Sequence, residues 1–246
     1  MVTATSDSSF LQSGYVPRYL EESILQDAQS LVASAPTRQS GDMTNEPLNA
    51  LILICTLSPS PKASSSDMLA RQIAAEFAKH KVESELVRIV DHNVMPGVLK
   101  DMGAGDDWPD LRKKLLEAQI LVLATPIWVG HPSSLAQRVL ERLDAELSET
   151  DDQGRPILFD KVAMVGVVGN EDGAHHVIAD LSQGLAEVGY TIPAQGSTYW
   201  VGEAMHTTDY QDLEQTPEVT ANATRISVRN TVHLAAALRD GPYPAA

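Results

Sequence analysis

From Leu48 onward, short apolar runs alternate with stretches in which apolar residues recur every three to four positions. The runs LNALILICTL and KVAMVGVVG are almost continuously apolar, which is typical of parallel strands covered on both faces. The pattern predicts strands at residues 48–57, 82–89, 119–125, 161–169 and 190–200. It predicts helices at residues 64–80, 108–118, 133–147, 174–189 and 216–240. This alternation predicts an α/β fold, a doubly wound five-stranded parallel sheet with helices on both faces.

Residues 1–47 have a different composition, rich in Ser, Thr and Asp. Within them, the segment PRYLEESILQDAQSLVASA repeats apolar residues at roughly helical spacing. The sequence therefore predicts an N-terminal arm, partly flexible with a short helix, followed by one domain over residues 48–246. Two interpretations stay open: a partly disordered tail, or an arm that packs on the domain or on a second subunit.

Charge and cysteine content exclude several classes of function. The net charge is -15 at pH 7, which argues against nucleic acid or an anionic membrane as the main partner. The single cysteine, Cys55, excludes an internal disulfide framework and a cysteine-based zinc site. We find no signal-peptide pattern and no apolar stretch near the ~20 residues of a membrane span. These features predict a soluble, cytoplasmic protein with no membrane span.

The first predicted strand is followed by a serine-rich loop, TLSPSPKASSSD, which leads into a helix. Helix N-termini offer unpaired N–H groups and a partial positive charge, and both favour phosphate. Hydroxyls of Ser58, Ser60, Ser64, Ser65 and Ser66 could add hydrogen bonds, and Lys62 could add a positive charge. Serine also caps helices for purely structural reasons, so both interpretations stay open.

The third strand ends in a turn that is unusually apolar, ATPIWVG at residues 124–130. Pro126 fixes one backbone angle, and Gly130 permits a conformation that other residues avoid. Trp128 offers a broad face on which an aromatic ligand could stack. Alternatively, Ile127 and Trp128 pack under a neighbouring loop or in a subunit interface.

The fourth strand leads into the loop GNEDGAHH at residues 169–176. Gly169 and Gly173 would let backbone amides approach a ligand edge, and Asn170 can both donate and accept. His175 and His176 are adjacent on a predicted helix and therefore do not face one another. Since no further residues with zinc-ligand spacing accompany them, the sequence predicts no metal site.

Together, the segments LILICTLSPSPKASSSDMLA, LVLATPIWVGHPSSLAQRVLERLD and VVGNEDGAHHV resemble the three FMN-binding loops of flavodoxin-like NAD(P)H-dependent FMN reductases and quinone reductases. The resemblance covers residues 48 to about 200. The chain departs from the family pattern at Thr56 and Leu57, where a small residue or glycine is usual. It also departs at Trp128, where tyrosine is common.

The resemblance implies a flavodoxin-like fold, FMN as cofactor and NADH or NADPH as reductant. It implies a cofactor site formed by Ser58, Ser64, Ser65, Ser66, Thr125, Pro126, Ile127, Trp128, Val129, Gly130, Gly169, Asn170, Gly173 and His175. No catalytic side chain is expected, because the flavin carries the chemistry. The implied activity is electron transfer from NAD(P)H to a quinone-like or other small acceptor. The long N-terminal arm and the apolar tip at residues 127–129 suggest a homodimer or homotetramer. The alternative is a non-enzymatic, flavodoxin-type electron carrier.

Residues 199–212, at the end of the last predicted strand and beyond it, carry several aromatic side chains, including Tyr199, Trp200 and Tyr210. They could cover a flavin or a neighbouring subunit's site. A surface loop packed on the domain would explain them equally well, so the sequence assigns them no role.

Overall fold

The structure is a computed structural model, and it describes residues 47–203 and 206–245. The predicted N-terminal arm lies outside these residues except for Pro47. The strands are β1 (Asn49–Ile54), β2 (Glu83–Arg88), β3 (Ile120–Trp128), β4 (His131–Pro132), β5 (Val162–Gly169) and β6 (Ser197–Val201). The helices are α2 (Ser65–Lys79), α3 (Trp108–Glu117), α4 (Ser134–Leu143), α5 (Ala174–Glu187) and α6 (Glu218–Asp240). Three short 3-10 helices are η1 (Ile89–Asp91), η2 (Asp144–Ser148) and η3 (Tyr210–Asp212).

Five of the strands form a parallel sheet in the order β2-β1-β3-β5-β6, and β4 pairs only with β3, antiparallel. This is the strand order of the flavodoxin-like fold. The prediction of a doubly wound five-stranded parallel sheet is confirmed. In such sheets, ligands bind beyond the carboxyl ends of the strands, where the strand order reverses. Here the reversal lies between β1 and β3.

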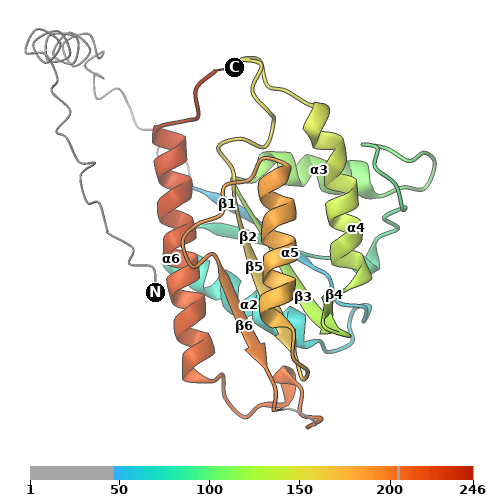
Figure 1. Ribbon diagram of the computed structural model, residues 1–246, viewed down its shortest axis with the longest axis vertical. Helices are drawn as coiled ribbons and strands as arrows, with labels where there is room; N and C mark the ends of the chain where they lie inside the picture. The colour runs from blue at the N-terminus through green and yellow to red at the C-terminus, as the bar shows by residue number, and fades with distance from the viewer. Residues whose placement is uncertain (1–46, 204–205, 246) are drawn as a thin grey trace, which may run out of the picture. The chain divides into compact units, whose positions relative to one another are not determined.

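The sheet separates two apolar layers, because alternate side chains of each strand point to opposite faces. Leu51 and Leu53 of β1 belong to the layer beneath α3, α4 and α5, while Ile52 and Ile54 belong to the layer beneath α2 and α6. Figure 1 shows α5 in front of the strands and α2 behind them. Within the described part of the chain, no helix combines the length and apolar character that crossing a bilayer requires.

The prediction for the fifth strand was wrong in its extent. The strand begins at Ser197 and not at residue 190, and Thr191 contributes only an isolated bridge to Val162. Pro193 has no N–H to donate to a neighbouring strand, and Gln195 adopts a left-handed backbone with φ 53°. The chain therefore turns between these points before it joins the sheet edge.

Candidate functional site

A cavity of about 290 Å³ lies where β1, β3 and β5 end. Its lining comes from the serine-rich loop after β1, the end of β3, the end of β5 and a segment between residues 200 and 211. This volume is close to the lower end of small-molecule sites, about 300 Å³. The cavity is therefore at the strand-order reversal, where the fold is expected to bind its ligand.

Most of the predicted cofactor residues line this cavity: Ser58, Ser64, Ser65, Ser66, Pro126, Ile127, Trp128, Gly169 and Asn170. The remaining predicted residues lie outside the lining: Thr125, Val129, Gly130, Gly173 and His175. Their contacts, described below, place most of them around the hairpin that follows β3.

The N-terminus of α2 presents hydrogen-bond donors to the cavity. Ser64 is the N-cap: its hydroxyl oxygen accepts from the Asp67 amide at 3.4 Å, and its carbonyl accepts from the Met68 amide at 2.9 Å. Helix geometry leaves the amides of Ser65 and Ser66 without a partner inside the helix. Both residues line the cavity. These amides and the positive end of the helix dipole suit a phosphate group.

The serine-rich loop is held in place by side chains from the β2 edge. The Arg88 guanidinium donates to the carbonyl oxygens of Ser58 at 3.2 Å and Lys62 at 2.8 Å. The Ser60 amide and hydroxyl donate to the Asp91 carboxylate at 2.8 and 2.5 Å. These hydrogen bonds hold the pKa of Asp91 below its ordinary value. The loop path is therefore set from outside the cavity: Ser60 bonds to Asp91, while Ser58, Ser64, Ser65 and Ser66 remain in the cavity lining.

The apolar segment at residues 124–130 forms the end of β3 and the tight turn of a β-hairpin. Val129 and Gly130 both have positive φ, 53° and 76°, and Trp128 pairs with His131 across the turn. Two central residues of this kind form the hairpin turn that matches the twist of the strands. Ile127 is 3% exposed, Trp128 54% and Val129 86%. The turn therefore supplies a buried cavity floor, a half-exposed aromatic wall and an outward-facing tip.

Thr125 braces the start of α4 and does not line the cavity. Its hydroxyl oxygen accepts from the Ser133 amide at 3.1 Å. The Ser133 hydroxyl donates to the Cys55 carbonyl at 2.6 Å and accepts from the Ala136 amide as the N-cap of α4. These bonds connect the ends of β1 and β3 to the first turn of α4. Thr125 therefore supports the hairpin from behind.

The glycines of the third loop allow close packing against β3 and its hairpin. Gly173 has φ 121°, and a Cβ built on it would lie 2.8 Å from the Gly130 Cα. A Cβ on Gly169 would lie 2.8 Å from the Ile127 Cδ1. His175 forms a hydrogen bond of 3.1 Å with the Tyr199 hydroxyl. Gly173 and Gly130 thus place the hairpin directly against the start of α5.

The end of β6 and the segment after it form a wall to which the sequence assigned no role. Trp200 and Tyr210 line the cavity, with their ring centroids 5.4 Å apart. Burial raises the pKa of Tyr210, and its hydroxyl donates to the Gln72 Oε1 of α2 at 2.6 Å. Asn170 donates to Asp209 at 2.9 Å, which joins the loop after β5 to this segment. In the sequence, the aromatic residues Trp200 and Tyr210 were the available signal for this wall. Only the fold brings them to the cavity.

The cavity combines the two chemical environments that a flavin phosphate requires. Its lining includes the serines at the start of α2 and Lys62, and also the apolar side chains of Ile127, Trp128 and Trp200. Gln211 also lines it, and its Oε1 is buried without a hydrogen-bond partner in the part of the chain that the structure describes. A ligand N–H could satisfy that oxygen. A planar aromatic ligand that carries a phosphate therefore fits this donor set.

Comparison with known proteins agrees with this geometry. The family described as NADPH-dependent FMN reductase matches residues 50–206. The 8-demethyl-8-aminoriboflavin-5'-phosphate synthase of Streptomyces davaonensis is 36% identical over 206 residues, which cover 80% of each protein. The divalent metal cation transporter MntH of Mycobacterium bovis is 36% identical over 214 residues, but the chain spans only 30% of its length.

Two solved structures are also similar to this chain. The crystal structure of RosB with bound 8-demethyl-8-formylriboflavin-5'-phosphate is 36% identical, with a TM-score of 0.72 over 80% of this chain and 82% of that one. An NADH:FMN oxidoreductase in its apo form shares the fold at 17% identity, with a TM-score of 0.56 over 79% of this chain and 92% of that one. The family match extends over more than half of the chain and covers all the strands except Asn49, the first residue of β1. The chain belongs to the NADPH-dependent FMN reductase family.

Proposed function

We propose that this protein is an FMN-dependent oxidoreductase that transfers electrons from NAD(P)H to a quinone-like or other small acceptor. FMN and NAD(P)H are the cofactor and the reductant of the family to which the chain belongs. The observation that carries the proposal is the cavity itself, which joins a helix N-terminus to aromatic walls at the strand-order reversal. Bound FMN would supply the redox chemistry that carries electrons from the nicotinamide to the acceptor.

In this proposal, the chain's own residues bind and orient. The amides of Ser65 and Ser66 and the hydroxyl of Ser58 hold the phosphate, and Lys62 adds positive charge. Trp128 would hold the ring system by stacking and, because it is half-exposed, would leave room for a flat acceptor to approach. Asn170 and Gly169, which also line the cavity, would contribute to holding the ring system. The predicted site residues that do not line the cavity act indirectly in this proposal, by positioning the hairpin and the start of α5. They are Thr125, Val129, Gly130, Gly173 and His175.

The overall reaction needs no protein nucleophile. NAD(P)H, a proton and a quinone give NAD(P)⁺ and a quinol, so two electrons and two hydrogen nuclei reach the acceptor. The exposed Trp128 and Val129 also offer apolar surface beside the cavity, which favours a homodimer or homotetramer as the working form.

A second candidate is chemical modification of a flavin phosphate held in the same cavity. The 36% identity to the aminoriboflavin phosphate synthase, over 80% of both proteins, favours it. The two candidates share a phosphate-anchored flavin and differ in its fate. In the first, the flavin is regenerated each cycle; in the second, it is consumed and leaves as a product.

Purified protein is expected to bind FMN and to oxidise NADH or NADPH continuously in the presence of a small quinone. The test follows nicotinamide absorbance with catalytic amounts of protein and identifies the flavin by chromatography before and after turnover. Unchanged FMN with many turnovers supports the oxidoreductase. A chemically altered flavin supports the second candidate. Bound FMN without sustained turnover or alteration supports an electron carrier, and failure to bind FMN contradicts all three.

Trp128→Ala is expected to weaken FMN binding by about five- to tenfold, equivalent to the ~1 kcal/mol of an aromatic stacking contact, while the fold is retained. The measurement is fluorescence titration of the protein with FMN, with circular dichroism as the check on folding. Leu147→Ala is the matched control, because Leu147 is also exposed but lies outside the cavity lining. Equal FMN affinity in both variants would remove Trp128 from the proposed site.

A further inference from the structure

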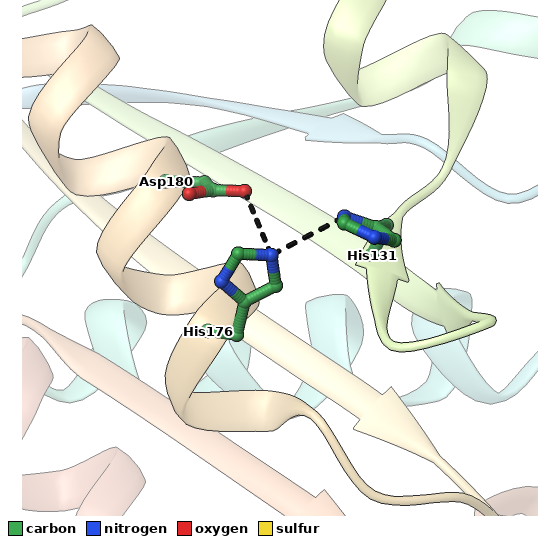
Figure 2. Close-up of side chains that lie close together, drawn as sticks. All are labelled: His131, His176 and Asp180. Atoms are coloured by element: carbon green, nitrogen blue, oxygen red, sulfur yellow. Dashed lines mark hydrogen bonds and ion pairs between the residues drawn. The ribbon is translucent and has the colours of Figure 1, made fainter.

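Two histidines and an aspartate meet on the outer side of the hairpin, away from the cavity lining. The Nε2 atom of His176 lies 3.2 Å from the Nδ1 of His131 and 3.3 Å from the Oδ2 of Asp180. One ligand atom from each of the three residues lies within 4.8 Å of the others. Figure 2 shows His131 and Asp180 pointing toward the same nitrogen of His176. All three side chains are exposed.

Tertiary structure creates this cluster from distant residues. His176 and Asp180 are one turn apart on α5 and so share a helix face. His131 follows the turn, opposite Trp128, and the close approach of Gly130 to Gly173 brings it to α5. The sequence predicted no metal site because His175 and His176 do not face one another. His131 was missed as the third group because it lies 45 positions before His176 in the chain.

The three groups offer more electron pairs than one proton can satisfy. The two imidazole rings are almost perpendicular, at 77°, with centroids 4.9 Å apart. A neutral imidazole has one N–H, so His176 Nε2 can either donate or accept here. If it donates, His131 and Asp180 compete for the same hydrogen. If it accepts from His131, its lone pair faces the carboxylate. A cation between the three atoms would satisfy all of them.

We propose that His131, His176 and Asp180 form a binding site for a first-row divalent transition metal, with Zn²⁺ as the reference ion. Imidazole and carboxylate ligands suit these metals. Ligand atoms about 2.0–2.1 Å from tetrahedral zinc lie about 3.3 Å from one another. The distances from His176 Nε2 to His131 Nδ1 and to Asp180 Oδ2 match that value. The ligand atoms of His131 and Asp180 would reach the same separation after a small side-chain rotation. Exposure to solvent leaves the fourth position to water.

The metal would act as a clamp between the β3–β4 hairpin and α5. His131 is the cross-strand partner of Trp128, and Trp128 lines the cavity. Fixing His131 to α5 would restrict the motion of the hairpin that carries this wall. The three ligands are positioning residues, because none of them lines the cavity.

The test is isothermal titration calorimetry of the full-length, tag-free protein with Zn²⁺ and, separately, with Mg²⁺. We expect one Zn²⁺ per chain and no comparable binding of Mg²⁺, which prefers oxygen ligands. His131→Ala, His176→Ala and Asp180→Asn should each weaken Zn²⁺ binding by at least about tenfold, since even indirect supports of metal sites contribute that much. Zn²⁺ should raise the unfolding temperature of the wild type more than that of these variants.

His175→Ala is the matched control: it is also exposed and adjacent to His176, but its side chain bonds Tyr199. It should bind Zn²⁺ as the wild type does. Wild-type protein without stoichiometric Zn²⁺ binding, or a His176→Ala variant with wild-type affinity, would overturn the proposal. Calorimetry of metal binding does not depend on flavin turnover, so its outcome is independent of the proposed oxidoreductase activity.

Discussion

Arg142→Met is expected to lower the free energy of unfolding by about 3–5 kcal/mol, the usual cost of breaking a buried ion pair. The Arg142 and Asp106 side chains are both 0% exposed, and Arg142 Nη2 lies 2.8 Å from Asp106 Oδ2. The guanidinium also donates to the carbonyl oxygens of Leu99 at 2.7 and 3.1 Å and Met95 at 2.9 Å. Methionine would leave these oxygens and a buried carboxylate without their main donor. Urea unfolding at pH 7 measures the loss.

Arg71→Met is the control for this variant, because Arg71 also pairs with an aspartate but its side chain is 68% exposed. A surface pair of this kind contributes at most about 1 kcal/mol. Equal destabilisation by the two substitutions would contradict the assignment of Arg142 as the tie between α4 and the loop before α3.

Lowering the pH should remove the stabilisation that the same ion pair provides. Burial alone raises the pKa of Asp106, but hydrogen bonds from Arg142 and from the amides of Met102, Met95 and Trp108 outweigh it and hold the pKa well below its ordinary value. The pair's contribution is therefore complete above the unfolded-state pKa of about 3.9 and is lost as pH falls toward the folded-state value. The difference between wild type and Arg142→Met should accordingly shrink below about pH 4.

Gly173→Ala is expected to cost about 2–6 kcal/mol of stability and to weaken FMN binding. The added Cβ would lie 2.8 Å from the Gly130 Cα and 3.0 Å from its carbonyl oxygen, on a backbone at φ 121°. The strained backbone costs about 1–3 kcal/mol, and overpacking typically adds about 1–3 kcal/mol. The obstacle is main chain, so the hairpin must shift and move Trp128. Urea unfolding and FMN titration measure the two effects.

Gly103→Ala separates backbone strain from the hairpin contact. Gly103 has a similar φ of 104°, but a Cβ there meets no atom within 4 Å. It should lose about 1–3 kcal/mol from strain alone and keep wild-type FMN affinity. If Gly173→Ala behaves identically in both measurements, the Gly130–Gly173 contact does not position the cavity wall.

The sequence predicted the parallel sheet because buried strands are recognisable as continuous apolar runs, as in residues 161–169. It was less reliable at residues 190–200, where Pro193 and the turn at Gln195 interrupt the strand. The serine-rich loop and Trp128 were predictable for a local reason, since each follows a strand at the edge where ligands bind. Trp200, near the end of β6, and Tyr210 and Gln211 beyond it were not, because their positions depend on where that strand joins the sheet and on how the chain returns after it.

By itself, the sequence determined the order of strands and helices, the loops that face the cavity and the family resemblance, all of which are encoded by local pattern and short motifs. Only the tertiary structure decided which side chains of those loops reach the cavity and which brace it. Thr125 supports α4, Val129 points outward, and Gly173 packs on Gly130. The tertiary structure also brought His131 close to His176 and Asp180. The physical reason is that such contacts depend on turn geometry and on packing between segments far apart in the chain, which no local pattern records.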